Sequence, residues 1–195
     1  ATEKSVYYAT FRKPPTRHEP IYEVGDNRIL FGGLQALCDL LFYEPITHEE
    51  IDESVAFLKG RKATANGFED FEFPEEMWRR VVNENEGYLP ITIRAMPEGS
   101  VIYPNEPFLE VTAPPGFGPL VPWFESTLLQ VWATSERLTA ARHMLKWGYN
   151  LIRKYERPEV SDEQCMTWAR LMIHDFGDRA AACPQESELV AKMHN

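Results

Sequence analysis

The chain has 195 residues, 44% of them hydrophobic and 26% charged, which is the composition of a folded globular protein rather than of a disordered one. Its formal net charge of −10 argues against a general nucleic-acid-binding protein, because such a surface needs clustered cations to displace counterions. The three cysteines form no CxxC pair and no segment has the pattern of a signal peptide or a membrane span, so we expect a cytoplasmic protein without a zinc knuckle or a membrane partner.

The beginning of the chain contains the signals of two short strands and a helix. The aromatic and β-branched run at 6–11 predicts a strand, and the prolines of the following segment, 12–20, predict a loop. A second short strand is expected at 28–31, where Gly32-Gly33 ends it. Apolar residues then recur at helical spacing, so we expect a helix from Leu34 to about Tyr43.

Two further helices are expected before residue 86. Thr47-His-Glu-Glu50 is a capping-box pattern, in which a hydroxyl and a carboxylate satisfy backbone amides reciprocally, and it predicts a helix ending near Gly60. The segment 59–71 has no clear period and is expected to be irregular. Pro74, followed by two acids, predicts the first turn of a helix that continues to about Asn85.

The middle of the chain has β character. Alternating residues at 88–96 lead into a turn at 97–99, and short β-rich runs follow at 100–103 and 108–112. Pro104-Asn105 marks a second turn between these two runs. Together these signals predict an antiparallel β segment with proline-bearing turns.

Helical patterns return after this β segment. A helix is expected from Pro122, and a second, longer helix is expected to open at Ser135 or Thr139 and to end before Pro158. Ser161 has the signals of the N-cap of another short helix, because Gln164 follows it at capping-box spacing.

The end of the chain predicts one more strand and helix. The apolar run 171–173 is expected to be a strand, and a helix is expected from Pro184. The order of elements fits an α+β fold: an antiparallel β-rich N-terminal domain with helices, 1–121, leads into a second domain, 122–195. That second domain would contain long helices and the first strand and helix of an incomplete α/β barrel.

Residues 174–179, His-Asp-Phe-Gly-Asp-Arg, follow the expected strand, at a place where α/β folds put binding residues. Phe176 offers a ring face to a flat heterocycle, Gly177 permits close approach of the backbone, and Arg179 offers a permanent cation to a phosphate or carboxylate. The alternative is that Phe176 belongs to the core and Arg179 pairs with one of the many acids. Asp-Phe-Gly does not indicate a protein kinase here, because no HRD-type catalytic loop precedes it.

Other candidate residues carry weaker signals. The basic pair Arg12-Lys13 is either an anion contact or part of a solvated loop. His143 is expected on the solvent face of its helix. Cys183 has no nearby histidine, and the chain contains no HExxH, GxSxG or Walker motif. The residues therefore predict no catalytic group and no metal site.

Four stretches taken together resemble nicotinamide phosphoribosyltransferase, a type II phosphoribosyltransferase. They occur in the order found in that family, and they are Phe31–Gln35, Gly87–Ser100, Trp123–Leu128 and His174–Arg179. The resemblance extends over nearly all 195 residues and covers the front half of the family's chain. Pro104–Pro107 also resembles the related nicotinate phosphoribosyltransferases, so the choice between the two stays open.

The resemblance implies a pentosyltransferase of NAD biosynthesis that makes nicotinamide mononucleotide from nicotinamide and phosphoribosyl pyrophosphate. It implies an antiparallel β domain joined to an α/β barrel, a homodimer with active sites at the interface, and magnesium accompanying phosphoribosyl pyrophosphate. On this resemblance, Phe176 stacks on the pyridine ring, and Arg179, beside Asp175, holds nicotinamide or the product phosphate. Lys13 or Arg12 is expected to contact phosphate from the partner subunit.

Two residues depart from the family's motif. Asp178 stands where some members have an aromatic residue, and Ala180 stands where the family has glycine. The family's first segment would precede Ala1, and its later catalytic histidine and phosphate loops would lie beyond Asn195. We therefore expect the isolated chain to be inactive and to need a complementary barrel portion. The alternative is an inactive, truncated paralogue that binds a pyridine nucleotide or regulates a full-length enzyme by pairing with it.

Overall fold

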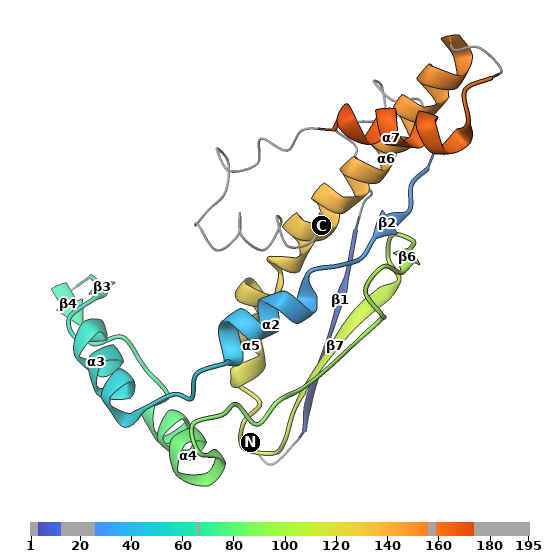
Figure 1. The fold of residues 1–195 in the computed structure, drawn as a ribbon. Helices are drawn as coiled ribbons and strands as arrows, with labels where there is room; N and C mark the ends of the chain where they lie inside the picture. Colours follow the sequence, from blue (N-terminus) through green and yellow to red (C-terminus); the bar gives the residue numbers. More distant parts are fainter. Residues whose placement is uncertain (1–3, 13–25, 66, 156–158, 174–195) are drawn as a thin grey trace. The chain divides into compact units, whose positions relative to one another are not determined.

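A computed structural model describes residues 4–12, 26–65, 67–155 and 159–173 of the chain (Figure 1). The described residues form a mixture of helices and strands, so the α+β class expected from the sequence is confirmed for them. The α/β barrel stays a prediction. No helix among the described residues is both long enough and apolar enough to cross a membrane.

The chain divides into two compact units, and each unit is built from several separate segments. Unit 1 contains Ala1–Tyr7, Cys38–Ile93 and Val111–Phe124, and unit 2 contains Tyr8–Leu37, Arg94–Glu110 and Glu125–Asn195. The division into 1–121 and 122–195 stays a prediction.

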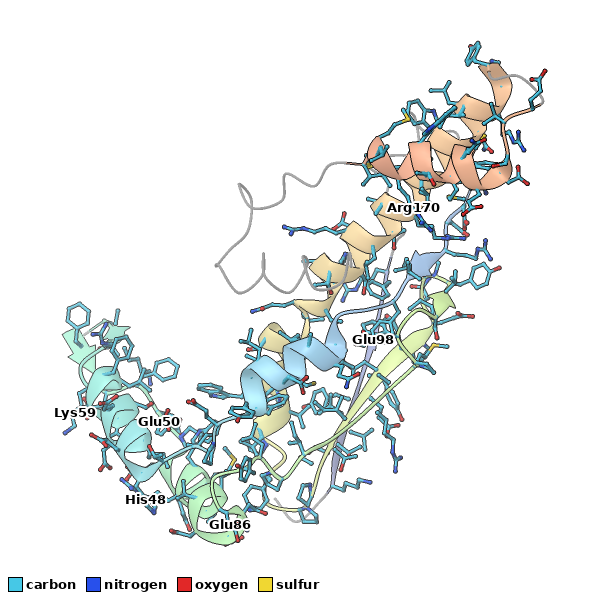
Figure 2. The ribbon with its side chains drawn as sticks, in the orientation of Figure 1. His48, Glu50, Lys59, Glu86, Glu98 and Arg170 are labelled. Carbon is cyan, nitrogen blue, oxygen red and sulfur yellow. The ribbon has the colours of Figure 1, made fainter. Side chains whose placement is uncertain are left out.

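Helix α3 (His48–Leu58) of unit 1 begins as the sequence predicts. The Glu50 amide donates to the Thr47 hydroxyl at 3.2 Å, and the Thr47 amide donates to the Glu50 carboxylate at 2.8 Å, so both halves of the capping box are present. Figure 2 labels His48 and Glu50 in the first turn of this helix. Helix α4 (Glu75–Asn85) also forms where it was expected, with Pro74 as its N-cap.

The expectation of irregular structure at 59–71 is wrong. Strands β3 (Lys62–Thr64) and β4 (Gly67–Glu69) form an antiparallel hairpin there. Most of its residues are exposed, so the alternation of buried and exposed side chains that identifies a strand is missing. Backbone bonds fix its base instead, because the Phe71 amide donates to the Leu58 carbonyl at 3.1 Å.

The core of unit 1 is aromatic. Trp78 of α4 is 5% exposed and meets Trp123 and Phe124 edge to face, with ring centroids 5.2 and 6.4 Å apart. Both partners belong to helix α5 (Leu120–Leu128), which forms near the position expected from the sequence. Edge-to-face contacts of this kind add stability beyond the area that they bury.

The strands of the β-rich segment form, but strands that are neighbours in the sequence do not pair as hairpins. Strands β1 (Ser5–Thr10), β7 (Pro107–Ala113) and β5 (Thr92–Ala95) make one sheet with β7 in the middle. Strand β6 (Val101–Ile102) pairs antiparallel with the distant β2 (Ile29–Leu30). Burial explains this choice, because Ile29 and Ile102 face each other and are 1% and 0% exposed.

Helix α6 (Val131–Tyr155) is longer than the sequence predicts. Its start was expected at Ser135 or Thr139, but both residues lie inside the helix and are fully buried. Their hydroxyls accept the backbone amides of Gly32 and Leu30, which lie outside the helix. Sequence spacing does not distinguish such a bond from N-capping. His143 is 7% exposed, so its expected solvent position is wrong; it lies four residues after Thr139, on the same buried face.

Helix α7 (Asp162–Leu171) has the capping box expected at Ser161, and it ends later than predicted. The strand expected at 171–173 is wrong: Leu171 is helical, Met172 is the C-cap, and the Ile173 amide donates to the Arg170 carbonyl at 3.1 Å. Cys165 and Ala169 lie one helical turn apart and are both fully buried. Burial of this face stabilises the helix as far as Leu171. The apolar run 171–173 is therefore the end of a helix and not a buried strand. Its first residue, Leu171, is 70% exposed.

Candidate functional site

One of the site residues predicted from the sequence, Arg12, lies among the described residues. Phe176, Arg179, Asp175 and Lys13 lie outside them. The structure therefore tests the setting of the predicted phosphate contact at the end of β1. It does not test the predicted ring-binding motif at 174–179.

Arg12 follows β1 and is exposed. It makes no hydrogen bond and no ion pair with any residue that the structure describes. Its guanidinium carries a permanent positive charge and a planar set of donors that matches phosphate. Within the described part of the chain, Arg12 is therefore an exposed cation without an acidic partner.

The residue before Arg12 is locked into the core of unit 2. Phe11 is 2% exposed, its ring stacks on Phe108 with centroids 4.4 Å apart, and Trp132 meets it edge-on at 6.1 Å. Successive side chains of extended backbone point to opposite sides, so burial of Phe11 directs Arg12 outward. Phe11 thus anchors the end of β1 and presents the arginine to solvent. The sequence reasoning missed this role, although an aromatic residue next to a basic pair was the available signal.

A tight turn from Tyr103 to Glu106 contacts the same strand end. The Asn105 amide donates to the Phe11 carbonyl at 2.6 Å. Within the turn, the Glu106 amide donates to the Tyr103 carbonyl at 3.2 Å, and the Glu106 carboxylate accepts the Tyr103 amide at 2.9 Å. The turn predicted at Pro104-Asn105 is therefore confirmed, and it holds the backbone at Phe11.

The Gly32-Gly33 pair, expected from the sequence to end a strand, lies directly before helix α2 (Leu34–Phe42), a place where other proteins can bind anions. Here its polar groups are used inside unit 2: the Thr134 hydroxyl donates to the Gly32 carbonyl at 2.8 Å, and the Gly32 amide donates to the Ser135 hydroxyl at 3.3 Å. Gly33 has φ of +95°, and a Cβ there would lie 2.5 Å from the Thr134 hydroxyl oxygen. The glycines thus serve close packing against α6.

The N-terminus of helix α2 (Leu34–Phe42), which follows these glycines, is also occupied. The Gln35 amide donates to the Glu98 carboxylate at 2.7 Å, and Figure 2 labels Glu98. A carboxylate in this position takes the place that an anionic ligand would use at a helix N-terminus. The stretch Phe31–Gln35 is therefore structural and is not a phosphate loop.

Asp26 is a carboxylate held by two arginines. Its side chain is 7% exposed, and it pairs with Arg28 at 2.9 Å and with Arg142 of α6 at 2.9 Å. The hydrogen bond from Arg28, helped by the charge of Arg142, holds the pKa of Asp26 well below its ordinary value although burial opposes this. The pair attaches the segment before β2 to α6, and both arginines are engaged by it.

The described residues do not offer a metal site. They contain no group of three or more His, Cys, Asp or Glu side chains placed to hold an ion. The exposed group at the end of β1 is a cation, which is not a ligand for magnesium.

The sequence of the chain was compared with protein-family models and with the sequences of known proteins. No protein-family model matches the chain. Nicotinamide phosphoribosyltransferase of Xanthomonas campestris pv. campestris (strain 8004) is 28% identical over 165 residues, which cover 84% of this chain and 32% of that protein. The chain is similar to a nicotinamide phosphoribosyltransferase. The resemblance drawn from the four stretches is thereby confirmed.

Among solved structures, a crystal structure of human nicotinic acid phosphoribosyltransferase matches with a TM-score of 0.48 and 20% identity, covering 88% of this chain and 31% of that one. The chain spans about a third of the length of each of these two proteins.

Proposed function

We propose that this chain provides part of a nicotinamide phosphoribosyltransferase, in which Arg12, with or without the neighbouring Lys13, contacts a phosphate of phosphoribosyl pyrophosphate or of the product. The observation that carries the proposal is the similarity over 165 residues to an enzyme of that name. The exposed Arg12, open among the described residues and held at the end of an anchored strand, supports it. The setting proposed for this reaction is cytoplasmic NAD salvage.

In the proposed reaction, the bond between ribose C1 and the pyrophosphate oxygen breaks, and a bond between C1 and the pyridine nitrogen forms. Arg12 binds and orients a phosphate, and Phe176 stacks on the ring while Arg179 and Asp175 contact the substrate beside it. Positioning of this kind lowers the barrier because the reacting atoms meet in a favourable geometry. Magnesium, brought in with phosphoribosyl pyrophosphate, would neutralise charge on the departing pyrophosphate.

These side chains orient substrates but provide no catalytic acid or base. We propose that turnover needs a complementary barrel portion, supplied by further chain, by a second copy or by a partner. Nicotinate in place of nicotinamide is a second substrate candidate. It rests on the Pro104–Pro107 turn, a stretch that resembles the nicotinate enzymes.

Formation of mononucleotide tests the proposal. The 195-residue chain is assayed with phosphoribosyl pyrophosphate, magnesium and either nicotinamide or nicotinate, alone and mixed with the remaining part of the relative from Xanthomonas. We expect no product from the chain alone and nicotinamide mononucleotide from the mixture. Product from the nicotinate arm alone would change the substrate. Absence of product in every mixture, together with no binding of any substrate, would contradict the proposed function.

We propose a non-catalytic function as the second candidate. Asp178 favours it because a carboxylate near a phosphate repels the anion. Ala180 favours it because it stands where the family motif has glycine. Calorimetry separates the two candidates. Binding of nicotinamide mononucleotide or of a full-length relative, without product in any mixture, would favour the non-catalytic module. An Asp178→Tyr, Ala180→Gly double variant that gained activity would show which residues had silenced it.

A further inference from the structure

The bond between Asn105 and Phe11 acts directly on the backbone of Arg12. The carbonyl that accepts the Asn105 amide at 2.6 Å belongs to the peptide group whose nitrogen is that of Arg12. A peptide group is planar, so a bond that fixes its carbonyl also fixes the direction of its N–H and the position of the next Cα. The same residue's aromatic ring is fixed by stacking on Phe108. Two contacts of Phe11, one through its carbonyl and one through its ring, therefore fix the direction in which the Arg12 side chain leaves the backbone.

The direction of the Asn105 amide depends on an unusual backbone conformation. Asn105 has φ of +68°, in the left-handed region, where asparagine is tolerated better than most residues. Pro104 precedes it, and the Glu106 amide bonds back to Tyr103 at 3.2 Å. Proline at the second position, positive φ at the third and this closing bond are the features of a type II turn.

In the commoner type I turn, the peptide between the two central residues is rotated by roughly half a turn, because ψ of the second residue and φ of the third both change sign. The amide of residue 105 would then point away from the Phe11 carbonyl. A residue at 105 that resists positive φ should therefore release the end of β1, although it touches no ligand itself.

We infer that Asn105 is a positioning residue for Arg12: by holding the Tyr103–Glu106 turn in its type II form, it fixes the peptide that precedes the phosphate-binding arginine. The inference rests on the proposed function of Arg12. The side chain of Asn105 makes no hydrogen bond with any residue in the described part of the chain, so its contribution is its backbone conformation. Glycine should replace it well and a β-branched residue poorly.

The test measures the affinity of the 195-residue chain for inorganic pyrophosphate by calorimetry. Arg12→Ala should weaken binding by roughly tenfold or more, the usual effect of removing a hydrogen bond to a charged group. Asn105→Val should weaken it by about threefold to tenfold, and Asn105→Gly should leave it unchanged. In the Arg12→Ala background, Asn105→Val should have no additional effect, because a positioning residue acts only through the group that it positions.

Two further measurements separate positioning from general damage. Thermal unfolding establishes that each variant is folded at the temperature of the titration. If Asn105→Val is not folded at that temperature, Asn105→Ala is used in its place. Hydrogen exchange at residue 105 should be slow in the wild type and in the glycine variant, and fast in the valine variant.

The outcomes distinguish the inference from the function on which it rests. An effect of Arg12→Ala with no effect of Asn105→Val, or with effects that add in the double variant, overturns the inference and leaves the proposed function intact. No binding by the wild type, or no effect of Arg12→Ala, overturns the proposed role of Arg12 and the inference with it. Loss with valine, retention with glycine and no additivity support both.

Discussion

The end of β1 and the Gly32-Gly33 pair have opposite roles in the structure. The first presents a charged side chain to solvent, and the second packs against α6. At the strand end, a buried aromatic residue presents the charged Arg12 to solvent. At the glycine pair, the hydroxyls of Thr134, Ser135 and Thr139 are all bonded inside unit 2. A polar group that is buried and satisfied stabilises a fold, whereas a cation exposed on an anchored backbone is available to a ligand.

The largest loss of stability is expected at Gly33. Gly33→Ala requires positive φ and places Cβ 2.5 Å from the Thr134 hydroxyl oxygen, so we expect it to cost about 3 kcal/mol or more of unfolding free energy in urea. Gly60→Ala is the matched control, because Gly60 also has positive φ, +62°, but nothing lies within 4 Å of its added Cβ. Its cost should be near 1 kcal/mol. Equal losses would show that strain alone, and not the contact with α6, makes Gly33 necessary.

Removal of one bonded hydroxyl should have an intermediate effect. Thr139→Val leaves the Leu30 amide without the acceptor that it has at 2.9 Å, and we expect a loss of about 1–3 kcal/mol in urea unfolding. Thr167→Val removes an exposed hydroxyl that donates within its own helix at 2.9 Å, and it should change stability by less than about 0.5 kcal/mol. A neutral Thr139→Val would mean that the attachment to α6 contributes little.

The Asp26 pair adds a dependence on pH. Because the pKa of Asp26 is lowered in the folded protein, its stabilisation is complete above the ordinary carboxylate pKa of about 3.9 and is lost as the pH falls through the folded value. The unfolding free energy should therefore decrease on acidification below about pH 4, and Asp26→Asn should remove part of that decrease. An identical pH profile for the variant and the wild type would show that the ion pair does not contribute.

The smallest effect on stability is expected at the candidate site itself. Arg12 is exposed and makes no contact with a described partner, so Arg12→Ala should change the unfolding free energy by less than about 0.5 kcal/mol. Urea unfolding measures this directly. A loss comparable to that of Thr139→Val would place Arg12 with the structural residues and would break the contrast between the two regions.

Local signals in the sequence correctly predicted the starts of helices α3 and α7. The capping boxes at Thr47 and Ser161 are both present, because their partners lie three residues away and no distant contact is needed. The turn at Pro104-Asn105 is local in the same sense. These features depend on bonds between near neighbours in the chain.

Distant partners account for the wrong expectations about strand pairing and about the start of α6. Pairing of β6 with β2 joins residues about seventy positions apart, and no local signal distinguishes it from a hairpin with β5. Ser135 and Thr139 resemble N-caps in the sequence, but they bond to backbone about one hundred residues away. The run 171–173 resembles a strand because periodicity cannot separate a short apolar strand from an exposed helix end. Anchoring of Arg12 by Phe11 and Asn105 is also a contact across the chain.

Titration of phosphoribosyl pyrophosphate into the chain tests most directly whether Arg12 is a phosphate contact. Wild type, Arg12→Ala and Arg94→Ala are compared by calorimetry. Arg94 is the matched cation, because its side chain is 75% exposed and its ion pair with Glu110 is long, at 3.5 Å. The account predicts that Arg12→Ala weakens binding by roughly tenfold or more while Arg94→Ala binds like the wild type. Equal affinities for all three proteins, or equal losses in both variants, would contradict it.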